Sequence, residues 1–213
     1  MSFPGFIGKK VGMTQVFDEE GSAIPVTVLE LLELVVTQVK TVEKDGYSAV
    51  QVGYVEAKPK HMTKARQGHL KKSELPLLRH LKEFRMEAND VAAYKVGDKV
   101  DLSFLEAGQA LKVSGKSIGK GFRSGIQRWG HARGPMSHGS KSHRLPGSIG
   151  AGTTPGRVFK GVHMAGRVGA KTATIQNLKV VRVLPEKKAL LVRGSVPGVE
   201  GGLLTVQLMA GRK

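Results

Sequence analysis

Short stretches of alternating apolar and polar residues occur toward both ends of this chain, and such alternation is typical of strands that bury one face. Ile24, Val26 and Val28 fall on one face, with Pro25 and Thr27 opposite. We therefore predict an early strand whose aliphatic face points inward.

More strands follow along the chain. Residues 35–41 are joined to residues 47–55 by Lys44-Asp45-Gly46, and Asp-Gly is a strong signal for a hairpin turn. Further strands are predicted at residues 99–104, 111–114, 174–184, 189–193 and 203–208. Many short strands separated by turn residues indicate a mainly β protein built on a closed antiparallel barrel.

Two segments break the strand pattern. In residues 57–95, Thr63 can cap a short helix reaching about Lys72, whereas the leucines before Phe84 fit a helix or a strand equally well. We interpret this segment as a small α+β insertion. Residues 115–171 hold 14 glycines among 57 residues and show no sustained period. A loop of that length inside a compact domain indicates a functional segment or one ordered by a partner.

The expected organisation is a single domain over residues 1–213, because 40% apolar content can bury one good core. Its barrel covers about 1–56, 96–117 and 172–213, the insertion about 57–95, and a long glycine-rich, basic, extended arm about 118–171.

Charge separates the two halves of the chain. Residues 1–106 carry 15 Lys and Arg against 15 Asp and Glu, whereas residues 107–213 carry 19 against only Glu186 and Glu200. The net charge of +17 therefore belongs to the second half. A stretch of one sign is tolerable where a polyanion supplies the missing charge, so nucleic acid is the leading partner and a solvated basic face is the alternative.

The arm has the side chains that RNA contacts require. Lysines and arginines bind phosphates, while aromatic rings and histidines stack on bases or donate hydrogen bonds to them. The candidate RNA-binding residues are Lys9, Lys10, Lys116, Lys120, Arg123, Arg128, Trp129, His131, Arg133, His138, Lys141, His143, Arg144, Arg157, Phe159, Lys160, His163, Arg167 and Lys171.

Other kinds of site are not supported. Gly115-Lys116-Ser117 ends like a phosphate-binding loop, but Ala110 stands where that motif requires glycine. The histidines of the arm lack acidic or cysteine companions, so we expect no metal and no cofactor. The sequence nominates no catalytic residue, and we predict no enzyme activity. Neither a membrane span nor a signal peptide is predicted.

Several motifs in order resemble one family. They are residues 8–14 (GKKVGMT), 119–122 (GKGF) with Arg128-Trp129, 142–150 (SHRLPGSIG) and 154–161 (TPGRVFKG). They are similar to protein three of the large ribosomal subunit, of bacterial or organellar type, and the likeness runs essentially end to end. Ser124 stands where the family often has glycine, and Ala151 where some members have a methylated glutamine, so that modification is expected to be absent.

The resemblance implies a translation-protein-type barrel and an arm that threads through large-subunit ribosomal RNA. It implies primary binding near the 3′ end of that RNA, nucleation of subunit assembly, and an arm tip close to the peptidyl-transferase centre. By position, the tip is Ser148, Ile149, Gly150, Ala151, Gly152, Thr153 and Thr154. The neighbours implied are large-subunit proteins fourteen and nineteen, with no membrane and no homo-oligomer, in the cytoplasm or inside an organelle. An RNA chaperone and an RNA-modifying enzyme remain as alternatives.

Overall fold

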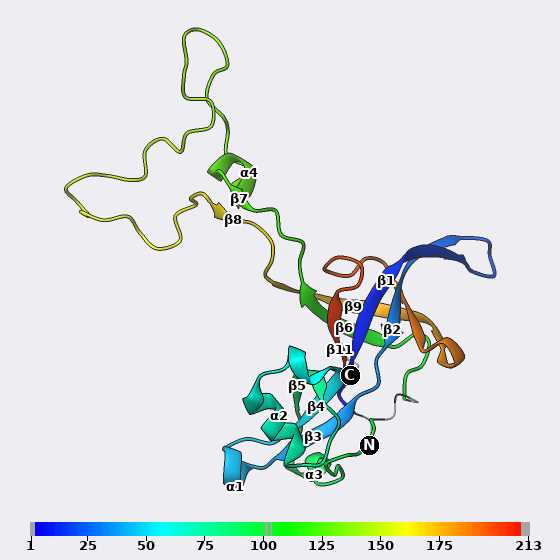
Figure 1. The fold of residues 1–213 in the computed structure, drawn as a ribbon. Coiled ribbons are helices and arrows are strands. Elements are labelled where there is room, and N and C mark those ends of the chain that lie inside the picture. The colour runs from blue at the N-terminus through cyan, green and yellow to red at the C-terminus, as the bar shows by residue number, and fades with distance from the viewer. Residues whose placement is uncertain (1–2, 101, 103, 210–213) are drawn as a thin grey trace. The chain divides into compact units, whose positions relative to one another are not determined.

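The computed structural model describes residues 3–100, 102 and 104–209 and divides the chain into two compact units. The barrel unit comprises Met1–Lys116 and Ala173–Lys213, and the arm unit comprises Ser117–Thr172. Both are drawn in Figure 1, where the arm unit runs from green to yellow.

Six antiparallel strands close the barrel, as expected from the sequence. Their order around it is β1-β11-β6-β9-β10-β2. The strands are β1 (Gly5–Phe17), β2 (Ala23–Leu31), β6 (Ala110–Lys116), β9 (Thr172–Leu184), β10 (Ala189–Arg193) and β11 (Leu203–Leu208). A single 3₁₀ turn, η2 (Pro185–Lys187), joins β9 to β10. The predicted strands at 111–114, 174–184, 189–193 and 203–208 are confirmed.

Strand β1 was not predicted, although it pairs with both β11 and β2. Glycines and adjacent lysines interrupt its alternation, so no apolar period stands out. Gly5 is required by close packing, because a Cβ there would run into the Val206 carbonyl and lie 3.1 Å from the Phe84 ring. Gly5 thus weakens the strand pattern in the sequence and also allows β1 to pack closely against its neighbours.

The face predicted for β2 is only partly right. Val26 is buried, but Val28 is half-buried and Thr27, predicted to face outward, is fully buried. The Thr27 hydroxyl donates a hydrogen bond of 2.6 Å to the Gly194 carbonyl oxygen, which satisfies it inside the protein.

A second sheet lies beside the barrel within the same unit, with the order β3-β4-β5. Its strands are β3 (Val35–Lys40), β4 (Ala49–Glu56) and β5 (Leu78–Arg85). The predicted hairpin exists, and the one-turn helix α1 (Val42–Asp45) with left-handed Gly46 forms its connection. Assigning β3 and β4 to the barrel was wrong, because the chain leaves strand conformation after Leu31 and β4 pairs with β5 instead.

The insertion contains the predicted helix. After the 3₁₀ turn η1 (Pro59–His61), α2 (Lys64–Lys71) begins behind Thr63 as its N-cap residue and ends at Lys72. Of the ambiguous leucines before Phe84, Leu78 and Leu81 belong to strand β5 and Leu77 directly precedes it. The short helix α3 (Ala88–Val91) follows β5.

The strand predicted at residues 99–104 is not present in the part that the structure describes. Lys99 forms only an isolated bridge with Val35, and Val100 donates a backbone hydrogen bond to Leu34. Residues 101 and 103 of that prediction lie outside the described residues.

One hydrophobic core joins the barrel to the second sheet. Phe3 packs edge-on against Phe84 of β5, with ring centroids 5.1 Å apart, and against Tyr94 at 5.4 Å. The same cluster contains Phe6, and Val206 of β11. Each buried side chain of this size stabilises the fold by roughly 1.5–3 kcal/mol. Because these side chains come from both sheets, each sheet stabilises the other.

Candidate nucleic-acid interface

The arm unit starts as two limbs that pair along their backbones. The Ser117 N–H donates to the Lys171 carbonyl oxygen, the Ala170 N–H donates to the Ser117 carbonyl oxygen, and the Lys120 N–H donates to the Val168 carbonyl oxygen. The limbs then form a two-stranded ladder of β7 (Phe122–Arg123) and β8 (Gly166–Arg167). Gly169 adopts a φ of +72°, and a Cβ there would collide with the Ile118 carbonyl, so the limbs meet where only glycine fits.

A stack of rings organises the next part of the arm unit. Helix α4 (Gly125–Trp129) ends at left-handed Gly130, and Trp129 stacks on His163 at 4.0 Å with an interplanar angle of 7°. His131 continues the stack at 5.9 Å from His163. The Trp129 indole N–H donates to the Met164 carbonyl oxygen at 2.9 Å. These three predicted base-stacking residues therefore contact one another, and Trp129 keeps 43% of its surface exposed.

Arg128 and Arg123 also have partners within the arm unit. The Arg128 guanidinium lies 4.8 Å from the Trp129 ring and donates to the Met164 carbonyl oxygen at 3.0 Å. Arg123 donates to the Lys120 carbonyl oxygen at 2.9 Å and to the Gln127 side chain at 3.3 Å. Arg128 therefore joins the two limbs, whereas Arg123 bonds only within its own limb.

The other cations of the arm unit project from its surface. Ten lysines and arginines occupy residues 117–172, with no Asp or Glu, and the eight besides Arg123 and Arg128 are exposed and make no side-chain hydrogen bond within the described residues. They are Lys120, Arg133, Lys141, Arg144, Arg157, Lys160, Arg167 and Lys171. Uncompensated cations on one segment create a positive field suited to a polyanion.

No residue of 117–172, all of which the structure describes, is buried. Large apolar side chains are exposed there, including Phe122 at 73%, Leu145 at 66% and Phe159 at 59%. Exposed apolar surface at this density marks a surface that a partner covers. Phe122 was expected from the sequence to stack on bases, whereas Leu145 was not among the candidate residues, although an apolar residue within an otherwise basic, glycine-rich run is the signal that reveals it.

The remaining candidates of the arm lie toward its far part. His143 is within 3.1 Å of the Pro135 carbonyl oxygen, and His138 is exposed with a φ of +55°. Ser148, Ile149 and Arg144 line a cavity of about 400 Å³ together with His131 and His163. The predicted tip, Ser148 to Thr154, is exposed throughout, and side chains added at Gly150 or Gly152 would meet no protein atom within 4 Å.

Three of the candidate RNA-binding residues lie in the barrel unit, and they differ in how free their ammonium groups are to contact RNA. Lys9 pairs with Glu30 at 3.5 Å, whereas Lys116 is exposed at the end of β6. The Lys10 ammonium donates to the carbonyl oxygens of Val196 and Gly198, at 3.3 and 3.0 Å. Lys10 therefore stabilises the loop before β11 and has a structural role.

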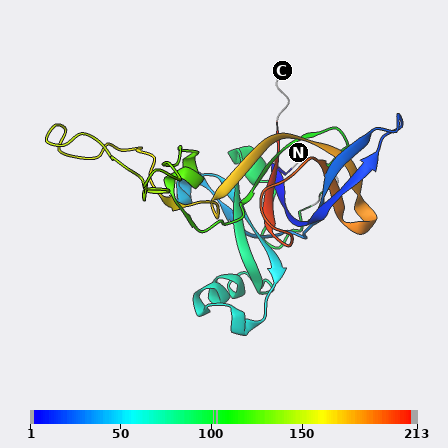
Figure 2. The ribbon, with the colours of Figure 1, turned by 90° about the horizontal axis from the view of Figure 1, so that it is seen from above.

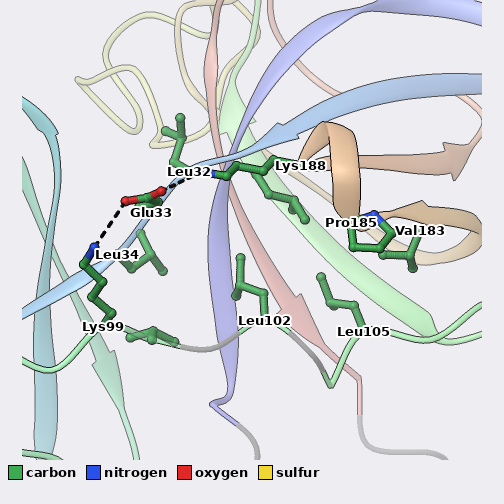
Figure 3. A pocket seen from close by; sticks show the side chains of 11 residues that line it. Leu32, Glu33, Leu34, Lys99, Leu102, Leu105, Val183, Pro185 and Lys188 are labelled. Carbon is green, nitrogen blue, oxygen red and sulfur yellow. Dashed lines mark hydrogen bonds and ion pairs between the residues drawn. The ribbon is translucent and has the colours of Figure 1, made fainter.

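The barrel unit also contains an apolar cavity of about 760 Å³, shown in Figure 3. Aliphatic side chains such as Leu102, Leu105 and Val183 line it. Glu33, the one carboxylate among the described residues that line it, is paired with Lys188 and Lys99, and the hydrogen bond from Lys188 lowers the Glu33 pKa. A carboxylate held in this way is a poor general base, so the cavity does not suggest catalysis.

Metal binding and membrane crossing are not supported by the described residues. Within the described residues, no group of three or more His, Cys, Asp or Glu side chains is placed to hold a metal ion. No helix of that part of the chain has the length and apolar character needed to cross a membrane.

Comparison with known proteins gives one family. The model of the family described as Ribosomal protein L3 matches residues 84–190. The large ribosomal subunit protein uL3 of Synechococcus sp. (strain JA-3-3Ab) is 54% identical over 203 residues, which cover 95% of this chain and 94% of the relative. The uL3 proteins of Prochlorococcus marinus (strain MIT 9515) and Thermosynechococcus vestitus are 50% and 49% identical, each over 95% of this chain and over 93% and 94% of the relative. With this identity across both units, and with the barrel and the basic arm that its motifs led us to expect, the chain belongs to the ribosomal protein L3 family.

Proposed function

We propose that this chain is a structural constituent of the large ribosomal subunit and binds large-subunit ribosomal RNA mainly through the arm unit. The observation that carries the proposal is the composition of residues 117–172, which hold ten cations, no carboxylate and no buried side chain. A segment of this kind gains little from packing on itself, and a polyanion provides both the missing charge and the missing contact surface.

The side chains divide into two roles. The eight projecting cations act as phosphate anchors, because Lys and Arg contacts to the backbone fix position without reading sequence. Phe122, Phe159 and the open part of the Trp129 stack meet unstacked bases or ribose faces. Ordering on binding is then expected for the far part of the arm, where backbone hydrogen bonds between the limbs are sparse.

The tip has a different role from the stem. Ser148 to Thr154 carries no charge, and its glycines leave the backbone open for close approach. We infer that the tip acts by shape near the peptidyl-transferase centre, while the stem supplies affinity. Early binding near the 3′ end of the RNA, nucleation of assembly, and contacts with large-subunit proteins fourteen and nineteen complete the proposal. The chemistry of peptide-bond formation belongs to the RNA in this scheme.

Sedimentation of cell extracts tests the proposal. An epitope-tagged chain should run with large subunits in a sucrose gradient and stay there after a wash at moderate salt. An RNA chaperone would spread across the gradient with many RNAs, and a modifying enzyme would be absent from mature subunits. Either distribution would contradict the structural role.

A further inference from the structure

A second basic surface lies outside the arm unit, in the segment formed by η1 and α2. Residues 58–72 hold six lysines and arginines and two histidines, with no Asp or Glu. We call this segment the basic platform. The overall charge balance of residues 1–106 conceals it, because acidic residues elsewhere in that half offset its charge.

The platform is held firmly on the second sheet. The Gln67 amide donates to the carbonyl oxygens of Pro59 and Met62, at 2.8 and 3.0 Å, and so ties η1 to α2. Leu70 is fully buried, and His69 lies 3.0 Å from the Gln51 side-chain oxygen on β4. Figure 2 shows this teal segment standing out from the ends of the strands that it follows and precedes. Its charges are therefore positioned before any partner arrives.

The outward face of α2 combines lysines with small residues. At about 100° per residue, Ala65, Gly68 and Lys72 lie within about 40° of the direction opposite buried Leu70, and Lys64 and Lys71 flank them at about 60° and 80° from it. All five of these residues are exposed. The helix thus presents three ammonium groups around a flat strip of backbone.

Gly68 is not explained by the fold of the protein itself. It lies inside the helix, where glycine is unfavourable relative to alanine. Its φ is not positive, and a Cβ there would meet nothing within 4 Å. A glycine that its own protein does not need is consistent with close approach of a ligand to the helix.

The platform's cations are not neutralised by the protein. The ion pairs found among the described residues engage Glu30, Glu33 and Glu83, and none includes a cation of the platform. Nor does any residue of 58–72 appear among the large exposed apolar side chains. Since the core of a protein–protein interface is apolar, this surface favours a polyanion over a protein partner.

We propose that the basic platform is a second RNA-binding surface, which contacts the phosphate backbone independently of the arm. This inference rests on the proposed function, because it takes ribosomal RNA as the ligand. Lys64, Lys71 and Lys72 contact phosphates, and the strip at Ala65 and Gly68 allows the backbone to approach the helix. The platform contributes affinity without sequence preference, as phosphate contacts do.

The first test measures binding of the full chain to large-subunit ribosomal RNA over a range of salt concentrations. The triple variant Lys64→Gln, Lys71→Gln and Lys72→Gln should bind about ten- to a hundredfold more weakly at 100 mM salt, with a salt slope lower by about 2 to 3. The matched control removes three exposed lysines outside the platform: Lys44→Gln, Lys95→Gln and Lys187→Gln. Equal loss in both triples, or no loss in either, would overturn the proposal.

The second test separates close approach from charge. Gly68→Gln adds an uncharged side chain that a helix accepts well, so the thermal midpoint should not fall. RNA affinity should nevertheless drop about tenfold, while Gly68→Ala changes it little. Unchanged affinity in Gly68→Gln would refute close approach at this strip.

The third test locates the platform in assembled particles. The chain has no cysteine, so Lys64→Cys gives a unique attachment point for a hydroxyl-radical probe. Cuts in ribosomal RNA are expected from Lys64→Cys but not from the control Lys44→Cys. Absence of cuts in particles that contain the labelled chain, or equal cuts from the control, would overturn the inference. Failure of the wild-type chain to enter large subunits would instead refute the proposed function itself.

Discussion

The charge of the arm unit sets a salt dependence that can be worked out in advance. Eight of its cations project without a side-chain hydrogen bond in the described part of the chain. If each neutralises one phosphate, the arm contributes a slope of roughly −6 to −7 to log affinity against log salt. Between 50 and 200 mM salt, a slope of about −7 lowers affinity about 10⁴-fold.

Removing half of these cations should remove half of the slope that the arm contributes to log affinity against log salt. The variant replaces four of them by glutamine: Lys141, Arg144, Arg157 and Lys160. The arm's share of the fall in affinity should shrink to about 10²-fold over the same range, because the arm retains four phosphate contacts and the contribution of the basic platform is unchanged. The control replaces four exposed lysines of the barrel unit: Lys44, Lys82, Lys95 and Lys187.

Filter binding of the full chains to large-subunit ribosomal RNA, at six or more salt concentrations, gives both slopes directly. The control should keep the wild-type slope, which excludes a general effect of net charge. A variant slope equal to that of the wild type would mean that these cations do not contact phosphates. The assignment of affinity to the arm would then be refuted.

Other predictions concern the tip, the stem and the second sheet. Gly152→Arg should leave incorporation into subunits intact but alter peptidyl transfer or sensitivity to drugs bound at that centre; wild-type behaviour in both assays would place the tip elsewhere. Replacing Arg128 and Arg157 by Ala should reduce incorporation in sucrose gradients, and Arg128→Ala alone should also expose Trp129, seen as a red shift of its fluorescence. Glu83 accepts hydrogen bonds that lower its pKa, chiefly from Lys40, so its stabilisation is present above the unfolded pKa and is lost as pH falls through the folded value. Glu83→Gln should therefore lower the thermal midpoint by about 2–4 °C at pH 7, for a loss of about 1 kcal/mol, and by less in acid; a pH-independent difference would contradict the ion pair.

The sequence predicted the barrel where strands alternate cleanly and failed where other constraints replace alternation. Residues 203–208 bury alternate side chains, residues 189–193 form a short apolar run, and both strands were placed to the residue. Strand β1 was missed because tight packing around Gly5 removes the side chains that a period would need. Alternation also says nothing about which sheet a strand joins, so β3 and β4 were assigned to the wrong one.

The candidate site was predictable from composition but not from pattern. A run without carboxylates identified the arm, and eight of its ten cations are exposed in the structure. The stack of Trp129 on His163 joins residues 34 positions apart and follows no local rule. The basic platform was overlooked because averaging charge over residues 1–106 cancels it against acids that lie elsewhere, such as Glu30 and Glu33.

The arm enters and leaves between strands that are adjacent in the barrel. Strand β6 ends at Lys116 and β9 starts at Thr172, and the hydroxyls of Ser114 and Thr174 lie 2.8 Å apart. In topological terms the arm is a very long hairpin loop that connects β6 to β9. Because closure entropy grows only logarithmically with loop length, such a loop destabilises the barrel by about 2 kcal/mol relative to a short turn. The length of the arm can therefore change over evolutionary time, while the barrel that carries it needs no redesign.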